Sequence, residues 1–145
     1  MHLGDGNASN GVFDGAYAWI GTVIPLSTVT ITTMKMWVTQ SADGTLTLGI
    51  YDSSFTKVAE TTTITNPTTG LVSGTLSASY TLNAGTLYYF GISGSINGLS
   101  VLGSTGLFSS NTPYIAKEDL NASSLPATFS GGSSTGRRFW IGAYA

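Results

Sequence analysis

The stretch GTLTLGIYD at residues 44–52 decides the fold, because its apolar side chains fall on every second position. Leu46, Leu48 and Ile50 share one parity, while Thr45, Thr47 and Tyr51 share the other. Successive side chains of a β-strand point to opposite faces, so this stretch predicts a strand with one oily face and one hydroxylated face.

Segments on the C-terminal side of this stretch continue the same pattern. Residues 57–60, 71–82 and 85–93 predict three further strands of one antiparallel system, with turn signals between them. Beyond residue 94 the pattern weakens. Short strands are expected at 99–101 and 127–129, and a last strand at 137–144.

Two strands are predicted on the N-terminal side. Residues 16–24 form the first and stop at Pro25, and residues 29–39 form the second. The apolar parity of the second strand changes around Thr32 and Thr33, which predicts a β-bulge or a bend between sheets. The Asp43-Gly44 pair predicts a tight hairpin that leads into the central stretch.

This spacing predicts an all-β fold: an antiparallel, jelly-roll-like β-sandwich of about eight to ten strands. The length of 145 residues suits a single domain covering 1–145. Residues 1–12 are expected to form an N-terminal arm, and residues 106–136 an irregular, loop-rich region. Residues 117–120 are too short to decide between a loop and one helical turn.

Composition excludes several classes of function. Charged residues make up 8% of the chain, the net charge is −2, and there is no cysteine. Thiolate metal sites and a basic footprint for nucleic acid are therefore excluded, and no apolar run is long enough for a membrane helix. Such weak self-repulsion favours association, so we expect a homo-oligomer, with a trimer favoured.

The sequence carries no catalytic constellation. Its only histidine is His2, too near the N-terminus to suit a catalytic triad, so no enzyme, no catalytic residue and no cofactor is expected. Calcium stays open at Asp5 to Asn7 with Asp14, or at Asp52 with Ser53, although turn chemistry explains these residues better. The carboxylates that could form a glycosidase pair are Asp14, Asp43, Asp52, Glu60, Glu118 and Asp119.

Aromatic residues are the remaining candidates for a functional site. The three tryptophans lie opposite the aliphatic parity of their strands, which places them on outer faces if the aliphatic parity forms the core. Three interpretations stay open: a core covered on both sides, a subunit interface, or a platform for a sugar ring. The interface or glycan-stacking candidates are Trp19, Trp37, Trp140, Tyr17, Tyr51 and Tyr144.

Four segments together resemble a known class of module. GIYD at 49–52, KVAE at 57–60, the turn at 67–70 and LNAGTLYYFGI at 82–92 resemble β-sandwich modules of tailed-bacteriophage virion proteins and of some bacterial surface proteins. The resemblance covers roughly residues 34–93 and carries no catalytic signature. It implies an accessory virion role, as a head decoration protein or as a fibre or tail adhesin.

Two hypotheses follow from the resemblance and the composition. The first is a non-enzymatic capsid decoration protein, in a virion assembled in the host cytoplasm, whose partner is the major capsid protein or another virion protein. The second is a carbohydrate- or receptor-binding adhesin module of a phage tail fibre or bacterial surface protein, extracellular or at the cell surface, with a surface glycan as ligand. Neither hypothesis involves nucleic acid or a membrane.

Overall fold

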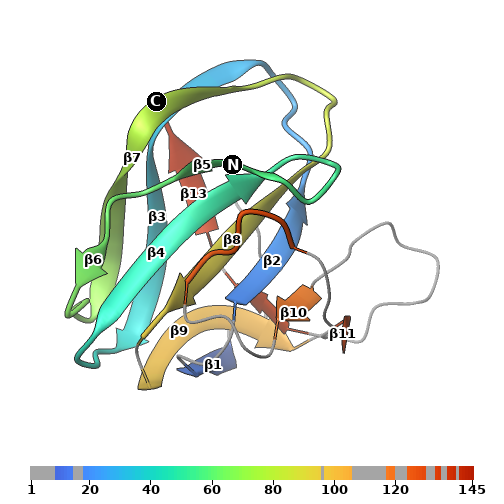
Figure 1. The fold of residues 1–145 in the computed structure, drawn as a ribbon. Coiled ribbons are helices and arrows are strands. Elements are labelled where there is room, and N and C mark those ends of the chain that lie inside the picture. Colours follow the sequence, from blue (N-terminus) through green and yellow to red (C-terminus); the bar gives the residue numbers. More distant parts are fainter. Residues whose placement is uncertain are drawn as a thin grey trace.

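The fold is all-β, as the alternating pattern predicts. The computed structural model describes residues 9–14, 18–95, 97–105, 117–119, 124–129, 133–134, 137–139 and 141–145, and these ranges contain strands and no helix. Six strands form sheet A and seven form sheet B, and every strand pair is antiparallel. The two sheets pack against each other as a β-sandwich (Figure 1).

The described residues form thirteen strands, more than the predicted eight to ten, and eight of these make up the two main layers. They are β1 (Ser9–Asp14), β2 (Ala18–Val23), β3 (Val29–Gln40), β4 (Thr45–Tyr51), β5 (Lys57–Glu60), β7 (Gly70–Leu82), β8 (Tyr88–Gly94) and β9 (Asn97–Thr105). Five shorter strands extend the layers. They are β6 (Ile64–Thr65), β10 (Lys117–Asp119), β11 (Ser133–Ser134), β12 (Arg137–Phe139) and β13 (Ile141–Tyr144).

The strand order is that of a jelly roll. Sheet A contains the order β1-β9-β3-β7, and sheet B contains the order β2-β8-β4-β5. In chain order, these eight strands therefore alternate between the two sheets, except from β4 to β5. Residues 33–36 of β3 pair with both β7 and β13. Since a strand bonds one neighbour on each side, β13 lies on the side of β3 away from β7.

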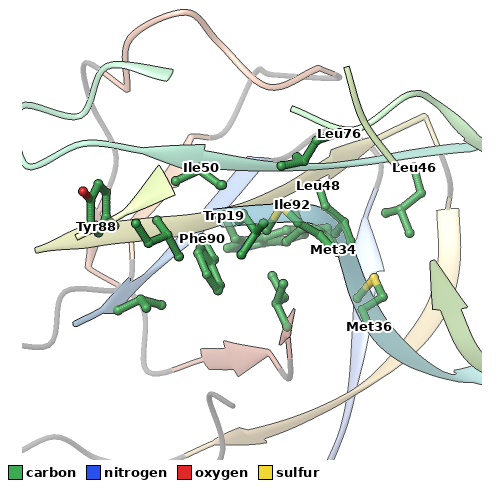
Figure 2. Close-up of a cluster of buried hydrophobic side chains, with 14 of the residues drawn as sticks. Trp19, Met34, Met36, Leu46, Leu48, Ile50, Leu76, Tyr88, Phe90 and Ile92 are labelled. Carbon is green, nitrogen blue, oxygen red and sulfur yellow. The ribbon is translucent and has the colours of Figure 1, made fainter. Parts of the chain in front are cut away.

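The main core fills the space between the sheets. Leu46, Leu48 and Ile50 are fully buried there, which confirms the predicted oily face of β4. Burying one such side chain contributes about 1.5–3 kcal/mol to folding. Figure 2 shows side chains of β2, β3, β4 and β8 meeting in this layer.

The bulge predicted in β3 is confirmed. The register between β3 and β7 shifts between Ile31 and Thr33. Ile31 is buried before the shift, and Met34, Met36 and Val38 are buried after it. Across the shift β3 advances by two residues, from Ile31 to Thr33, while β7 advances by five, from Tyr80 to Thr75, so the extra residues of the bulge lie on β7. Both halves of β3 thereby face the same core although their apolar parities differ.

Two expectations about connections are wrong. The turn at Asp43 and Gly44 does not close a hairpin, because β3 belongs to sheet A and β4 to sheet B. For the same reason residues 44–93 do not form one sheet, since β7 pairs with β3. Both strands have one apolar face, and placing them in opposite layers lets those faces bury each other.

The terminal regions also differ from expectation. Residues 9–12 of the predicted arm belong to β1, which pairs with β9. Residues 117–119 form the strand β10 on the edge of β2 and not a helical turn. The last predicted strand is divided into β12, which pairs with β9, and β13, which pairs with β3. Residues 127–129 make only one bridge, from Thr128 to Thr56.

Candidate interaction surface

The outer face of sheet B is covered by the chain itself. Residues 124–129, here called the clasp, place Leu125 and Phe129 in a second small core, where they are 4% and 2% exposed. Leu125 fits a slot that exists because Gly49 and Gly91, which pair directly, have no side chains. A Cβ on Gly49 would lie 2.6 Å from Leu125 Cδ1.

Hydrogen bonds hold the clasp in place. The Lys57 N–H donates to the Ala127 carbonyl at 2.8 Å, and the Phe129 N–H donates to the Phe55 carbonyl at 2.9 Å. The Tyr51 hydroxyl donates to the Pro126 carbonyl at 2.8 Å. The clasp is thus hydrogen-bonded to residues 55–57 at the start of β5, and its Leu125 lies over Gly49 and Gly91.

The Lys57 side chain adds a further link to the clasp. Its ammonium donates to the Leu125 carbonyl at 3.0 Å and pairs with Glu60 at 2.7 Å. Glu60 is thereby engaged in an ion pair on β5, which gives this carboxylate a structural role.

The outer face of sheet A carries exposed apolar side chains instead. Trp37 on β3, Leu71 on β7 and Tyr144 on β13 are 44%, 47% and 37% exposed. Trp37 lies directly opposite Leu71 across the strand pair, and side chains in such positions touch. With Lys35, these residues form the sheet A patch.

Lys35 and Tyr144 form one unit within this patch. The Lys35 ammonium lies 4.3 Å from the centre of the Tyr144 ring, a cation–π contact worth about 0.5–1 kcal/mol at an exposed site. Gly142 lies opposite Lys35, and a Cβ there would come within 2.8 Å of Tyr144 Cε2. The glycine therefore lets the Tyr144 ring lie flat over β13, next to Lys35.

Hydroxyl groups continue the same face beyond the bulge. The hydroxyls of Thr30 and Thr81 are 2.8 Å apart across β3 and β7, and both side chains are exposed. Along β3, β7 and β13, Lys35 is the only charged residue. On these three strands the face therefore combines a polar area without charged residues and an apolar area with one charge.

The predicted site residues have different positions in the structure. Trp19 and Tyr51 are 2% and 0% exposed, so of the three open interpretations a core covered on both sides holds for them, and their candidacy as interface or glycan-stacking residues is wrong. Trp19 faces the main core, while the clasp covers Tyr51. Trp37 and Tyr144 lie on the exposed face of sheet A. Tyr17 and Trp140 lie outside the described residues.

Two members of the patch were not predicted. Leu71 begins the predicted strand at 71–82, and its parity differs from that of Leu76 and Leu82, which places its side chain on the opposite face. Lys35 stands between Met34 and Met36, and that alternation already places its side chain on the outer face of β3.

The described residues show no acidic cluster that could hold a metal. No group of three or more His, Cys, Asp or Glu side chains gathers there. Asp52 Oδ1 accepts the N–H groups of Ser54 and Thr56 at 2.9 and 3.0 Å, which is the turn chemistry expected for this residue. No helix in the described ranges is long and apolar enough to span a bilayer.

Two tyrosines have perturbed acidity for structural reasons. Burial raises the pKa of the Tyr80 phenol, and the nearby Tyr88 and Asp52 raise it further. Tyr80 and Tyr88 meet edge to face with their ring centres 6.2 Å apart. Burial also raises the pKa of Tyr89, which stacks on Phe55. A raised phenol pKa keeps these groups neutral and does not activate them as bases.

Comparisons with known proteins give no match. No protein-family model, curated protein or solved structure matches the chain.

Proposed function

We propose that this chain is a non-enzymatic structural protein of a virion, a decoration protein bound to the outside of the capsid. Its partner is the major capsid protein or another virion protein, and it docks through the sheet A patch. The resemblance of residues 34–93 to virion modules supports the virion setting. The low net charge of −2 supports a subunit that functions within an assembly.

One observation carries the docking proposal. Trp37, Leu71 and Tyr144 together expose large apolar side chains on one sheet face, whereas the clasp covers the opposite face over Gly49 and Gly91. Tryptophan and tyrosine are enriched among the residues that dominate protein interfaces. A rigid sheet also holds them at fixed spacing, which lowers the entropy lost on binding.

Reconstitution on particles tests this proposal. Particles from the natural source, stripped of this chain, are incubated with the wild type, with Trp37→Ala or with Leu26→Ala, and occupancy is measured by electron microscopy. Leu26 is 95% exposed on the β2–β3 loop, so Leu26→Ala is the matched loss of an exposed apolar side chain. We expect Trp37→Ala alone to lower occupancy. Equal occupancy of all three chains, or particles without this chain, would refute the proposal.

A second candidate function is the adhesin alternative, in which the Trp37 ring stacks on a surface glycan. The exposed hydroxyls of Thr30 and Thr81 on the same face favour it, because sugars need hydrogen-bonding neighbours. Leu71 opposite Trp37 argues for a protein partner, since leucine offers a sugar no hydrogen bond. A glycan array, followed by titration of tryptophan fluorescence, distinguishes the two functions.

A further inference from the structure

The sheet A patch carries a positive charge that no acidic side chain among the described residues neutralises. The Lys35 ammonium contacts the Tyr144 ring, and within the described ranges the only salt bridge is Lys57 with Glu60. No other charged residue lies on β3, β7 or β13. A partner that covers Trp37 and Leu71 must therefore also accommodate a positive charge next to them.

Desolvating this ammonium without a counter-charge would oppose binding. A buried charge is tolerated in proteins when it is paired and hydrogen-bonded. The face of the Tyr144 ring attracts the Lys35 ammonium only weakly, through a cation–π contact. A second copy of the chain, placed on the patch by a two-fold axis through Lys35, would bring a second lysine to the same place. Charge complementarity therefore favours a different, acidic partner.

We propose that the sheet A patch binds a protein segment in which an aspartate or glutamate stands beside an aromatic or aliphatic side chain. The apolar side chain packs on Trp37 and Leu71, and the carboxylate pairs with Lys35. This inference rests on the proposed docking function and specifies the chemistry of the partner. The bond from ammonium to carboxylate is charge-assisted, which makes it stronger than a neutral hydrogen bond.

A random-peptide phage library is the probe that tests the proposal. The library is selected on the immobilised wild-type chain and counter-selected on Trp37→Ala, so that only peptides bound at the patch are retained. Enriched peptides are synthesised, and their affinities are measured for the wild type, Lys35→Met and Lys35→Arg. Lys35→Met keeps an apolar contact with Tyr144 but removes the charge, whereas Lys35→Arg keeps the charge.

We expect the retained peptides to carry an acidic residue next to an apolar one. Lys35→Met should weaken the binding of these peptides about tenfold, whereas Lys35→Arg should retain most of the wild-type affinity. Added salt should weaken binding to the wild type more than to Lys35→Met. Two results would refute the acidic partner but not docking at the patch. The retained peptides could lack acidic residues, or their binding could be insensitive to Lys35→Met. If no peptide distinguishes Trp37→Ala from the wild type, docking at the patch fails as well.

Discussion

Replacing Gly49 with alanine is expected to destabilise the fold although the backbone favours the change. Alanine loses less conformational entropy than glycine in a strand, a gain of about 0.5–1 kcal/mol. The added Cβ would lie 2.6 Å from Leu125 Cδ1 and 3.1 Å from the Ala59 carbonyl oxygen, whereas ordinary contacts begin at 3.4 Å. Overpacking of this kind costs about 1–3 kcal/mol. We therefore expect a net loss of about 1–2 kcal/mol.

A double-mutant cycle in urea separates the two effects. Leu125→Ala alone should lower the free energy of unfolding by about 2–5 kcal/mol, because Leu125 is 4% exposed and fills the slot. In that background the clash with Leu125 is gone and only the 3.1 Å approach to the Ala59 carbonyl oxygen remains, so Gly49→Ala should cost less than in the wild type or be stabilising. Leu125 and Gly49 should thus couple by more than about 1 kcal/mol. Additive effects, or a Gly49→Ala single variant more stable than the wild type, would refute the packing described for the clasp.

Three further outcomes are expected. Tyr51→Phe removes the hydrogen bond to the Pro126 carbonyl, so urea denaturation should give a free energy of unfolding about 1 kcal/mol lower. An unchanged midpoint of urea denaturation would contradict that hydrogen bond. Trp37→Ala, at a side chain 44% exposed, should change that free energy by less than about 1 kcal/mol, and a larger loss would place Trp37 in the core. Burial raises the pKa of Tyr89 in the folded state, so its stabilising contribution is complete below the unfolded pKa and is lost as pH rises through the folded pKa. Thermal melts above pH about 10 should therefore lose less stability in Tyr89→Phe than in the wild type, and equal losses would exclude this linkage.

Features that depend on local alternation could be predicted from the sequence. Leu46, Leu48 and Ile50 identify the buried face of β4, because a strand sends every second side chain to the same side. The parity change around Thr33 similarly locates the bulge in the pairing of β3 with β7. Each of these two patterns involves only a few neighbouring residues, so it can be identified without knowledge of distant contacts.

Features that depend on distant contacts could not be predicted. On β2, Ala18 and Ile20 face the second core while Trp19 faces the main one, so parity alone cannot tell which side is exposed. The second core depends on Leu125, far along the chain, fitting between two glycines. Asp43 and Gly44 match a hairpin turn locally, yet the pairing partners of β3 and β4 are other strands.

The candidate surface could be predicted only in part. Trp37 is a candidate in the sequence because its parity is opposite to that of Met36 and Val38. Its neighbour Leu71 becomes relevant only once β7 pairs with β3 in the observed register. The contact between Lys35 and Tyr144 likewise requires β13 to pair with β3.

The position of β13 on β3 has a consequence for timing during synthesis. β3 and β7 lie in the first half of the chain or just beyond it, but β13 begins only at Ile141. A nascent chain still inside the ribosome exit tunnel at residue 141 cannot yet place the Tyr144 ring beside Lys35. The complete sheet A patch thus forms only after nearly all of these residues have been translated.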